Sequence, residues 1–243
     1  MKSLALGVSA LALASSLAAA ADLPARNLPV QQAPVALPLF IGFYAGLNVG
    51  GGWNRDSFTE TSSCVPTCVV SATGRGSGVI GGAHFGYAFR FNNVVLGLEG
   101  DFGPSSMSHT TVIPLSEPDT VKSSLIADGS LRMRLGYAMD LVMPYITGGV
   151  AFGDIRHNYS VYTSSAPYTL TGTYETSRWR TGWTLGTGVE WAFAPFWTAR
   201  IEYRYTDYGH ANDTLGPPVY ASTFTQKHRE SFNSVRIGVT RYF

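Results

Sequence analysis

The sequence predicts an all-β protein: one eight-stranded antiparallel up-and-down β-barrel that spans a membrane. Three observations support this fold class. After residue 38, segments of about ten residues alternate apolar with polar or glycine residues, which is the pattern of a two-faced strand. Short and long links between these segments alternate along the chain. The chain also has 27 glycines and 13% aromatic residues but only 14% charged residues, whereas soluble domains carry about 25%.

The N-terminus, residues 1–21, has the features of a secretory signal peptide. Lys2 provides a positive start, an apolar run from Leu4 to Leu17 follows, and Ala18–Ala21 offers a small-residue cleavage site. A membrane-anchoring helix needs about 20 apolar residues, so the run is too short for one. We expect export through a cleaved signal peptide.

Residues 22–39 form a proline-rich stretch before the barrel. Proline lacks the backbone donor that a strand ladder needs and favours extended, unpaired chain. We expect residues 22–39 to be a periplasmic lead-in and residues 40–243 to be the outer-membrane β-barrel. The prolines of the lead-in are Pro24, Pro29, Pro34 and Pro38.

The alternation of apolar and polar residues predicts eight strands. The clearest is Trp179–Phe193, where one parity is aromatic or aliphatic and the other is glycine, threonine, arginine and glutamate. The predicted strands are Phe40–Trp53, Gly76–Phe89, Val94–Phe102, Ser124–Ala138, Val142–Asp154, Trp179–Phe193, Trp197–Tyr208 and Ser231–Phe243.

The links between the predicted strands indicate the orientation of the barrel. Outer-membrane barrels place short turns in the periplasm and long loops outside the cell. Because the first link is long and the number of strands is even, both ends of the barrel lie in the periplasm. The short links are residues 90–93, 139–141 and 194–196, and the long links are residues 54–75, 103–123, 155–178 and 209–230.

The cost of burying arginine decides which parity faces lipid. An arginine near the bilayer midplane costs about 2–4 kcal/mol on the lipid face. Five such residues would exceed the whole stability of a typical domain, about 5–15 kcal/mol. The alternative, a soluble lipocalin-like barrel, would pack large aromatic residues into a bore that eight strands leave narrow. We therefore expect the apolar parity to face lipid.

Aromatic residues near the strand ends are typical of the two girdles at the membrane surfaces. The expected girdle residues are Trp53, Phe89, Phe102, Tyr137, Phe152, Trp179, Trp191, Phe193, Trp197 and Tyr208.

The inward parity gathers five acidic and five basic residues. Unpaired charges in a narrow, poorly hydrated interior are costly, so we expect these groups to pair with one another. A plug of ion pairs is the favoured interpretation, and a gated conduction path is the alternative. The predicted lumen charge network is Glu99, Asp101, Asp128, Arg132, Arg134, Glu190, Arg200, Glu202, Arg204 and Arg236.

Cys64 and Cys68 are the two cysteines of the chain. In an exported protein, a nearby pair of this kind favours a structural disulfide. The spacing is not Cys-x-x-Cys, and no second group of ligands accompanies the pair, so a redox or metal role is disfavoured.

Three segments resemble the small outer-membrane β-barrel proteins of alphaproteobacteria, which are often called porin-family proteins and include major surface antigens. The segments are residues 43–51, 144–153 and 235–243. The resemblance covers the chain after the signal peptide, and it implies an eight-stranded barrel of the OmpA type. It also implies a C-terminal assembly signal, formed here by Val235, Ile237, Val239 and Phe243; Arg241 departs from the apolar residue usual at its position.

The sequence shows no catalytic constellation and no phosphate-binding or dinucleotide motif, and we expect no cofactor and no metal. The net charge of +1 disfavours a nucleic-acid partner. Some members of the resembled family are linked to haem binding, but we expect the histidines in or near the long links to be solvated. They are His109, His157, His210 and His228. His84 is expected in the lumen, hydrogen-bonded to an acid.

These features predict a non-enzymatic integral protein of the cell outer membrane that contributes to envelope integrity and displays surface loops. Its expected partners are outer-membrane lipids, the barrel-assembly machinery, and envelope or host surfaces that contact the loops. The alternatives are a narrow porin-like channel for ions or small solutes, a surface ligand binder for haem, and a lipid-modifying enzyme at the barrel rim. The sequence assigns no oligomeric state.

Overall fold

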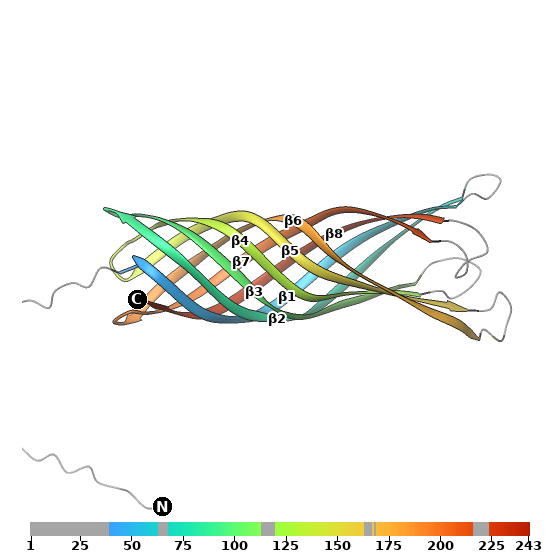
Figure 1. Ribbon diagram of the computed structural model, residues 1–243, viewed down its shortest axis with the longest axis horizontal. Coiled ribbons are helices and arrows are strands. Elements are labelled where there is room, and N and C mark those ends of the chain that lie inside the picture. The colour runs from blue at the N-terminus through green and yellow to red at the C-terminus, as the bar shows by residue number, and fades with distance from the viewer. Residues whose placement is uncertain (1–38, 63–67, 113–119, 163–166, 168, 216–223) are drawn as a thin grey trace, which may run out of the picture. The chain divides into compact units, whose positions relative to one another are not determined.

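The computed structural model describes residues 39–62, 68–112, 120–162, 167, 169–215 and 224–243. These residues form eight strands that pair in chain order and close into one barrel (Figure 1). The predicted fold class is therefore confirmed. The strands are β1 (Gly42–Ser62), β2 (Cys68–Phe91), β3 (Val94–Val112), β4 (Thr120–Tyr137), β5 (Val142–Tyr162), β6 (Leu170–Ala194), β7 (Trp197–Leu215) and β8 (Phe224–Tyr242).

The barrel closes between its first and last strands. β1 pairs with β8 in antiparallel register from Tyr44 opposite Tyr242 to Ser62 opposite Phe224, and on its other side it pairs with β2. Closure matters in a bilayer because no water is present to bond an open strand edge. Among the described residues, no helix is both long enough and apolar enough to cross a membrane.

The strands extend far beyond the predicted bounds, so the prediction of four long loops was wrong. Residues 55–62 of β1, for example, pair with residues 68–75 of β2, inside the first predicted loop. The prediction ended each strand where the apolar alternation ended. The alternation arises only where one face of the sheet meets an apolar environment, whereas a backbone ladder needs only a neighbouring strand. Strand pairing can therefore continue where both faces of the sheet are polar.

The three links predicted to be short are short, and each is a two-residue turn. They are Asn92–Asn93, Asp140–Leu141 and Pro195–Phe196. Each turn contains a residue in the left-handed region: Asn92 has φ 53°, Asp140 has φ 50° and Phe196 has φ 66°. Asn and Asp tolerate this region better than other side chains. Phe196 follows a proline, the residue order of a type II turn.

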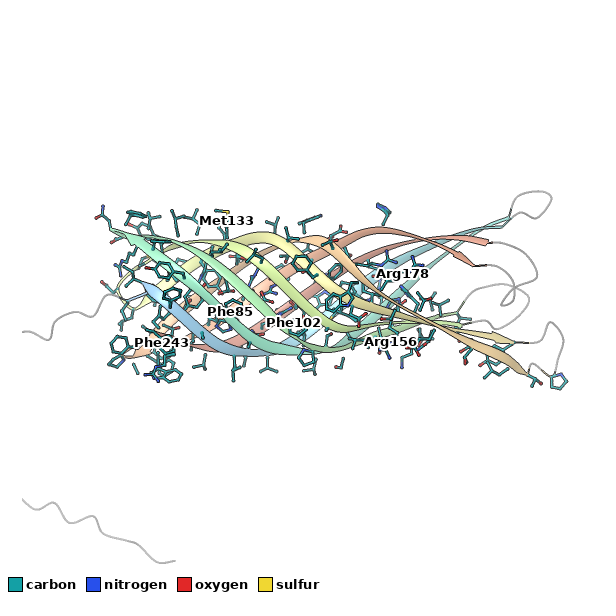
Figure 2. All side chains as sticks on the ribbon, viewed as in Figure 1. Phe85, Phe102, Met133, Arg156, Arg178 and Phe243 are labelled. Atoms are coloured by element: carbon teal, nitrogen blue, oxygen red, sulfur yellow. The ribbon has the colours of Figure 1, made fainter. Side chains whose placement is uncertain are left out.

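The outer surface of the barrel is an apolar belt, as predicted. Met133, Phe85 and Phe102 lie on this surface (Figure 2), where they are 71%, 63% and 59% exposed. Nine of the ten expected girdle residues also point outward. An apolar exterior of this extent matches hydrocarbon as solvent.

Tyr208, the tenth expected girdle residue, points into the barrel and is buried. The register between β7 and β8 shifts between Asp207 and His210, and Gly209 has φ +73°. Such a β-bulge inserts an extra residue and changes which face the next side chain meets. The Tyr208 ring packs at 72° to the ring of Phe232, with 5.6 Å between centroids.

Candidate functional site

The barrel interior contains a charged layer, defined here as the ten residues of the predicted lumen charge network. Each of them lies on an inward-facing position of β3, β4, β6, β7 or β8, and none is more than 6% exposed. Inward and outward side chains alternate along a strand, so the charged residues, which neighbour the outward apolar residues in the chain, point into the barrel. The structure brings all ten together.

Two ion pairs of the charged layer join β7 to β3. Arg200 Nη1 lies 2.6 Å from Glu99 Oε2, and Arg204 Nη1 lies 2.9 Å from Asp101 Oδ1. β3 and β7 are four strands apart in a closed order of eight, so they are opposite walls of the barrel. Side chains from the two walls therefore meet inside the bore.

A third ion pair joins another two opposite walls. Arg236 Nη2 of β8 lies 2.7 Å from Asp128 Oδ2 of β4. Three ion pairs therefore cross the bore, two between β7 and β3 and one between β8 and β4, and their side chains occupy the bore at the depth of the charged layer.

Arg132 connects the acids of the layer. Its Nη2 lies 2.5 Å from Glu99 Oε1 and 3.1 Å from Asp101 Oδ2, and its Nη1 lies 2.9 Å from Glu202 Oε1. Arg204 Nη2 approaches the same Glu202 oxygen at 2.9 Å. Contacts shared among several carboxylates suit the planar, multi-donor guanidinium group and fix its orientation.

Arg134 and Glu190 form a further ion pair of the layer. The guanidinium of Arg134 also lies 3.8 Å above the ring of Tyr145. Glu190 Oε1 accepts hydrogen bonds from Thr198 Oγ1 at 2.5 Å and from Tyr242 Oη at 2.9 Å. Five guanidinium groups thus face five carboxylates. Loss of one partner would leave a buried charge uncompensated.

The sequence analysis missed three tyrosines that belong to this site. Tyr44 donates to Glu99 Oε2 at 3.1 Å, Tyr145 to Glu202 Oε2 at 3.0 Å, and Tyr242 to Glu190 Oε1. They were missed because the sequence analysis considered aromatic residues only on the apolar parity and in the girdles. Their parity was the available signal: Tyr44, for example, shares its face with Asn48.

An inward glycine makes room for one of these tyrosines. A Cβ placed on Gly86 of β2 would lie 2.5 Å from the ring of Tyr44 on the adjacent β1. Any other residue would displace the ring from Glu99.

Two layers of buried apolar side chains, which the sequence analysis did not predict, flank the charged layer. On the side of the short turns, the buried apolar residues are Phe40, Tyr44, Ala88, Val95, Ala138, Met143, Ala192 and Tyr242. On the other side they are Ile80, Met107, Leu125, Ala151, Ile155, Tyr208 and Phe232.

The second apolar layer depends partly on a bulge. The register of β4 shifts between Leu125 and Ala127. Before the bulge the inward residues of β4 have odd numbers, such as Leu125. After the bulge they have even numbers, such as Asp128 and Arg132. A sequence pattern read with one constant period cannot show this change of face.

A histidine layer, defined here as Asn54, His109, Ser123, His157 and Glu230, lies beyond the second apolar layer. Asn54 Nδ2 lies 2.8 Å from His109 Nδ1, Ser123 Oγ lies 2.9 Å from His157 Nδ1, and His157 Nε2 lies 3.4 Å from Glu230 Oε1. All five side chains are buried. Asn54, His109, Ser123 and Glu230 border one small space.

The expectation of solvated histidines was therefore wrong for His109 and His157. Both lie on inward positions of strands that were predicted to be loop, because the ladder continues past the apolar alternation. His210 is exposed on β7, as expected. His228 lies in β8, and its side chain lies outside the described part of the structure.

His84 is buried in the lumen, but its hydrogen bonds differ from the expectation. Its Nε2 lies 2.9 Å from Thr240 Oγ1 and its Nδ1 lies 3.3 Å from Asn48 Nδ2. The acids of the charged layer are already engaged by arginines, so the hydrogen-bond partners of His84 are neutral groups.

The remaining predicted sites are placed as follows. Cys64 lies outside the described residues, and Cys68 is the first residue of β2, with its side chain outside the described part. Val235, Ile237, Val239 and Phe243 point outward in one row, from 37% to 71% exposed. In the described ranges, no group of three or more His, Cys, Asp or Glu residues is arranged to hold a metal ion.

Comparison with solved structures supports the fold. The outer membrane protein OprG from Pseudomonas aeruginosa superposes with a TM-score of 0.53 at 12% identity, covering 84% of this chain and 97% of that chain. The outer membrane protease OmpT from Escherichia coli gives a TM-score of 0.50 at 8% identity, covering 84% and 98%. At these identities the likeness concerns the fold alone.

Comparison with known sequences identifies the family. The 25 kDa outer-membrane immunogenic protein of Brucella melitensis is 32% identical over 94% of this chain and 95% of its own length. The 31 kDa outer-membrane immunogenic protein of the same organism is 31% identical over the full length of both chains. The family model described as outer membrane protein beta-barrel domain matches residues 7–243. With its closed eight-stranded barrel and apolar exterior, the chain belongs to this family of outer-membrane β-barrel proteins.

Proposed function

We propose that this outer-membrane protein is non-enzymatic and non-conducting, contributes to envelope integrity, and carries polar strand ends and loops at the cell surface. The observation that supports this most is the set of cross-wall ion pairs, Arg200–Glu99, Arg204–Asp101 and Arg236–Asp128. An ion that crossed the bore would have to separate buried pairs, which is strongly unfavourable.

The narrow porin-like channel is the main alternative, and recording across a planar bilayer tests it. The purified protein is inserted into the bilayer, and a porin with a wide bore is inserted under the same conditions to show that the recording detects open barrels. We expect no reproducible conductance steps from this protein. Stable steps of constant size would establish the channel instead.

Enzymatic activity at the rim is the next alternative. Ser123, His157 and Glu230 are residue types that occur together in hydrolases, and here Ser123 is hydrogen-bonded to His157, which lies at ion-pair distance from Glu230. All three side chains are buried, which disfavours access of a substrate to Ser123. We expect Ser123→Ala to leave the composition of outer-membrane lipids unchanged, and an altered lipid profile would overturn the non-enzymatic assignment.

Haem binding is tested by titration of the purified protein. Haem ligation by His109 or His157 would require opening of the histidine layer, because both rings are buried. We expect no histidine-ligated haem spectrum from the wild type. A spectrum that is lost in His109→Ala, His157→Ala, His210→Ala or His228→Ala would instead assign a haem ligand.

The expected orientation of the barrel and the names of its relatives support surface display. The Brucella relatives are named immunogenic proteins. We infer that the strand ends opposite the short turns, with their connecting residues, are accessible to antibodies and to envelope or host surfaces. Antibodies raised against the folded protein should label intact cells, and labelling that requires permeabilised cells would contradict this.

Processing and the cysteine pair complete the proposal. We propose that residues 1–21 are removed on export, that residues 22–39 form the lead-in, and that Cys64 and Cys68 form a disulfide. N-terminal sequencing of the outer-membrane protein should begin near Asp22. Without reductant, thiol alkylation should leave the mass of the protein unchanged, and two added alkyl groups would contradict the disulfide.

The C-terminal signal is tested by comparing assembly with stability. Phe243 is 71% exposed at the end of the outward row of β8. We expect deletion of Phe243 to reduce assembly in cells through the barrel-assembly machinery several-fold, while the melting of refolded protein changes little. Equal loss in both measurements would assign Phe243 a purely structural role.

A further inference from the structure

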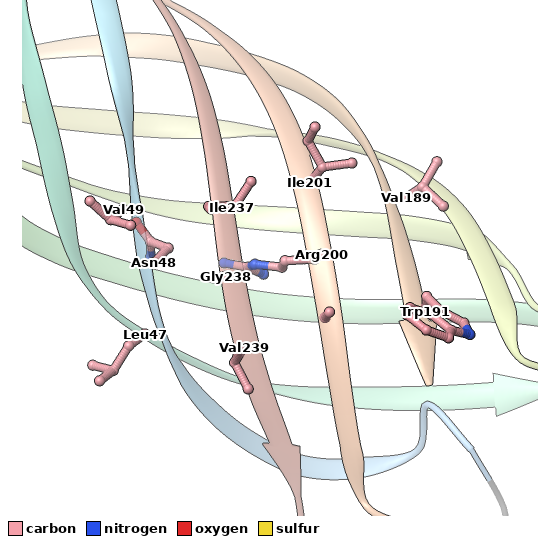
Figure 3. Close-up of a pocket in the computed structure, with 11 residues that line it drawn as sticks. Leu47, Asn48, Val49, Val189, Trp191, Arg200, Ile201, Ile237, Gly238 and Val239 are labelled. Atoms are coloured by element: carbon pink, nitrogen blue, oxygen red, sulfur yellow. The ribbon is translucent and has the colours of Figure 1, made fainter. Parts of the chain in front are cut away.

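An apolar groove of about 710 Å³ lies on the outer face of the barrel, across β1, β8, β7 and β6 (Figure 3). Leu47 and Val49 of β1 border one side, and Val189 and Trp191 of β6 border the other. The small, half-buried Ala199 lies between them on β7, where a larger side chain would fill the groove. The volume is within the range of small-molecule sites, about 300–1,000 Å³.

Arg241 lies at one end of this groove. It follows Val239 in the outward row of β8, and in the strand register it pairs with Trp197 on β7 and with Ala45 on β1. The row before it, Ala199–Val239–Leu47, lines the groove. Arg241 is therefore the next outward-facing residue of β8 after those that line the groove, on the side of the short turns.

The surroundings of Arg241 leave its charge available. Its guanidinium carbon lies 5.5 Å from the ring centroid of Trp197 and 5.3 Å from that of Phe243. Within the described ranges, no carboxylate lies at ion-pair distance from it. Aromatic rings orient a guanidinium but do not satisfy its five N–H donors. A cation at this level of the girdle faces the phosphate groups of the bilayer.

We propose that this groove binds one phospholipid of the periplasmic leaflet, with an acyl chain along the groove and the lipid phosphate on Arg241. The short turns face the periplasm in outer-membrane barrels, so the end of the groove at Arg241 lies in the periplasmic leaflet. The guanidinium fork matches a phosphate group in charge and geometry.

A second copy of the chain is a poorer occupant of the groove. A dimer with its two-fold axis along the membrane normal would bring the two Arg241 side chains to the same depth at one interface. Like charges in an apolar interface are unfavourable, whereas a phosphate offers the opposite charge.

Lipid binding is measured by native mass spectrometry of the full protein, extracted in mild detergent and titrated with dioleoyl phosphatidylglycerol. We expect one retained lipid on the wild type. Arg241→Gln should weaken its retention about tenfold, as expected for the loss of one charge-assisted contact, and Arg241→Lys should restore most of it.

The groove is tested separately from the charge. Ala199→Leu should abolish the specific lipid, while Ala83→Leu, which adds the same bulk to the outward face of β2 outside the groove, should retain it. Dioleoylglycerol, which has no phosphate, should bind the wild type and Arg241→Gln equally. Heat-modifiable migration on a gel confirms that each variant is folded. Equal lipid retention by the wild type, Arg241→Gln and Ala199→Leu, or a dimer in place of the lipid, would overturn the site.

Discussion

The charged layer and the histidine layer lie in the same barrel but close it differently. The charged layer joins opposite walls, as between Glu99 of β3 and Arg200 of β7. The contacts of the histidine layer join strands that are closer in the closed order, as between Ser123 of β4 and His157 of β5. Arginine is long enough to cross half the bore, whereas Ser, Asn and His are not. The difference shows that joining opposite walls of the barrel requires side chains as long as arginine.

The largest effect is expected from breaking the charged layer at Glu202. Its Oε1 is shared by Arg132 and Arg204 at 2.9 Å each. Glu202→Leu removes that shared carboxylate and leaves excess positive charge buried, so we expect the free energy of unfolding to fall by about 3–5 kcal/mol. Urea unfolding of protein refolded into lipid vesicles measures this.

The matched control for Glu202→Leu is the same substitution at Glu175. Glu175 pairs with Arg156 at 3.0 Å, but the two side chains are 53% and 40% exposed. An exposed pair contributes about 0–1 kcal/mol. A similar loss of stability in Glu175→Leu and Glu202→Leu would mean that the interior charges are not buried pairs.

A smaller effect is expected in the histidine layer. His157→Leu removes the hydrogen bond to Ser123 and the contact with Glu230, at a cost of about 1–3 kcal/mol for buried polar groups left without that partner. His210→Leu, at an exposed position of β7, should change stability by less than about 0.5 kcal/mol. A loss in His157→Leu as large as that in Glu202→Leu would erase the distinction between the layers.

The smallest effect is expected at the bulge that turns Tyr208 inward. Gly209 has φ +73° and open space around it, so Gly209→Ala meets only backbone strain, about 1 kcal/mol. Gly51 has the same open space without a positive φ, so Gly51→Ala should be neutral or slightly stabilising. Thermal melting in detergent distinguishes the two, and equal melting would argue against the strained bulge.

Much of the fold was predictable because the lipid and the lumen impose opposite demands on alternate residues. Trp179–Phe193 shows this most clearly: its outward residues are aromatic or aliphatic, and Glu190 on the other parity is buried in the charged layer. The ten charged residues could be assigned to the interior because arginine on the lipid face is too costly.

The other features of the fold and the site could not be predicted, for two physical reasons. Outside the bilayer the strands lose the apolar alternation but keep their backbone ladder, so His109 and His157 were assigned to loops. Bulges change the inward parity within a strand, so Leu125 and Tyr208 could not be placed by a constant period. Tyr44, Tyr145 and Tyr242, which donate to the acids, could have been predicted only from their alternate positions along the strands, which face inward.

The contact between opposite walls is tested most directly by a double-mutant cycle on Glu99 and Arg200, whose side chains meet at 2.6 Å. Unfolding free energies of Glu99→Ala, Arg200→Ala and the double variant are compared with the wild type in lipid vesicles. The structure predicts a coupling energy of at least about 1.5 kcal/mol, within the range for residues in direct contact. Additive effects within about 0.5 kcal/mol, as for residues that do not touch, would show that the walls do not meet and that the bore is not closed in this way.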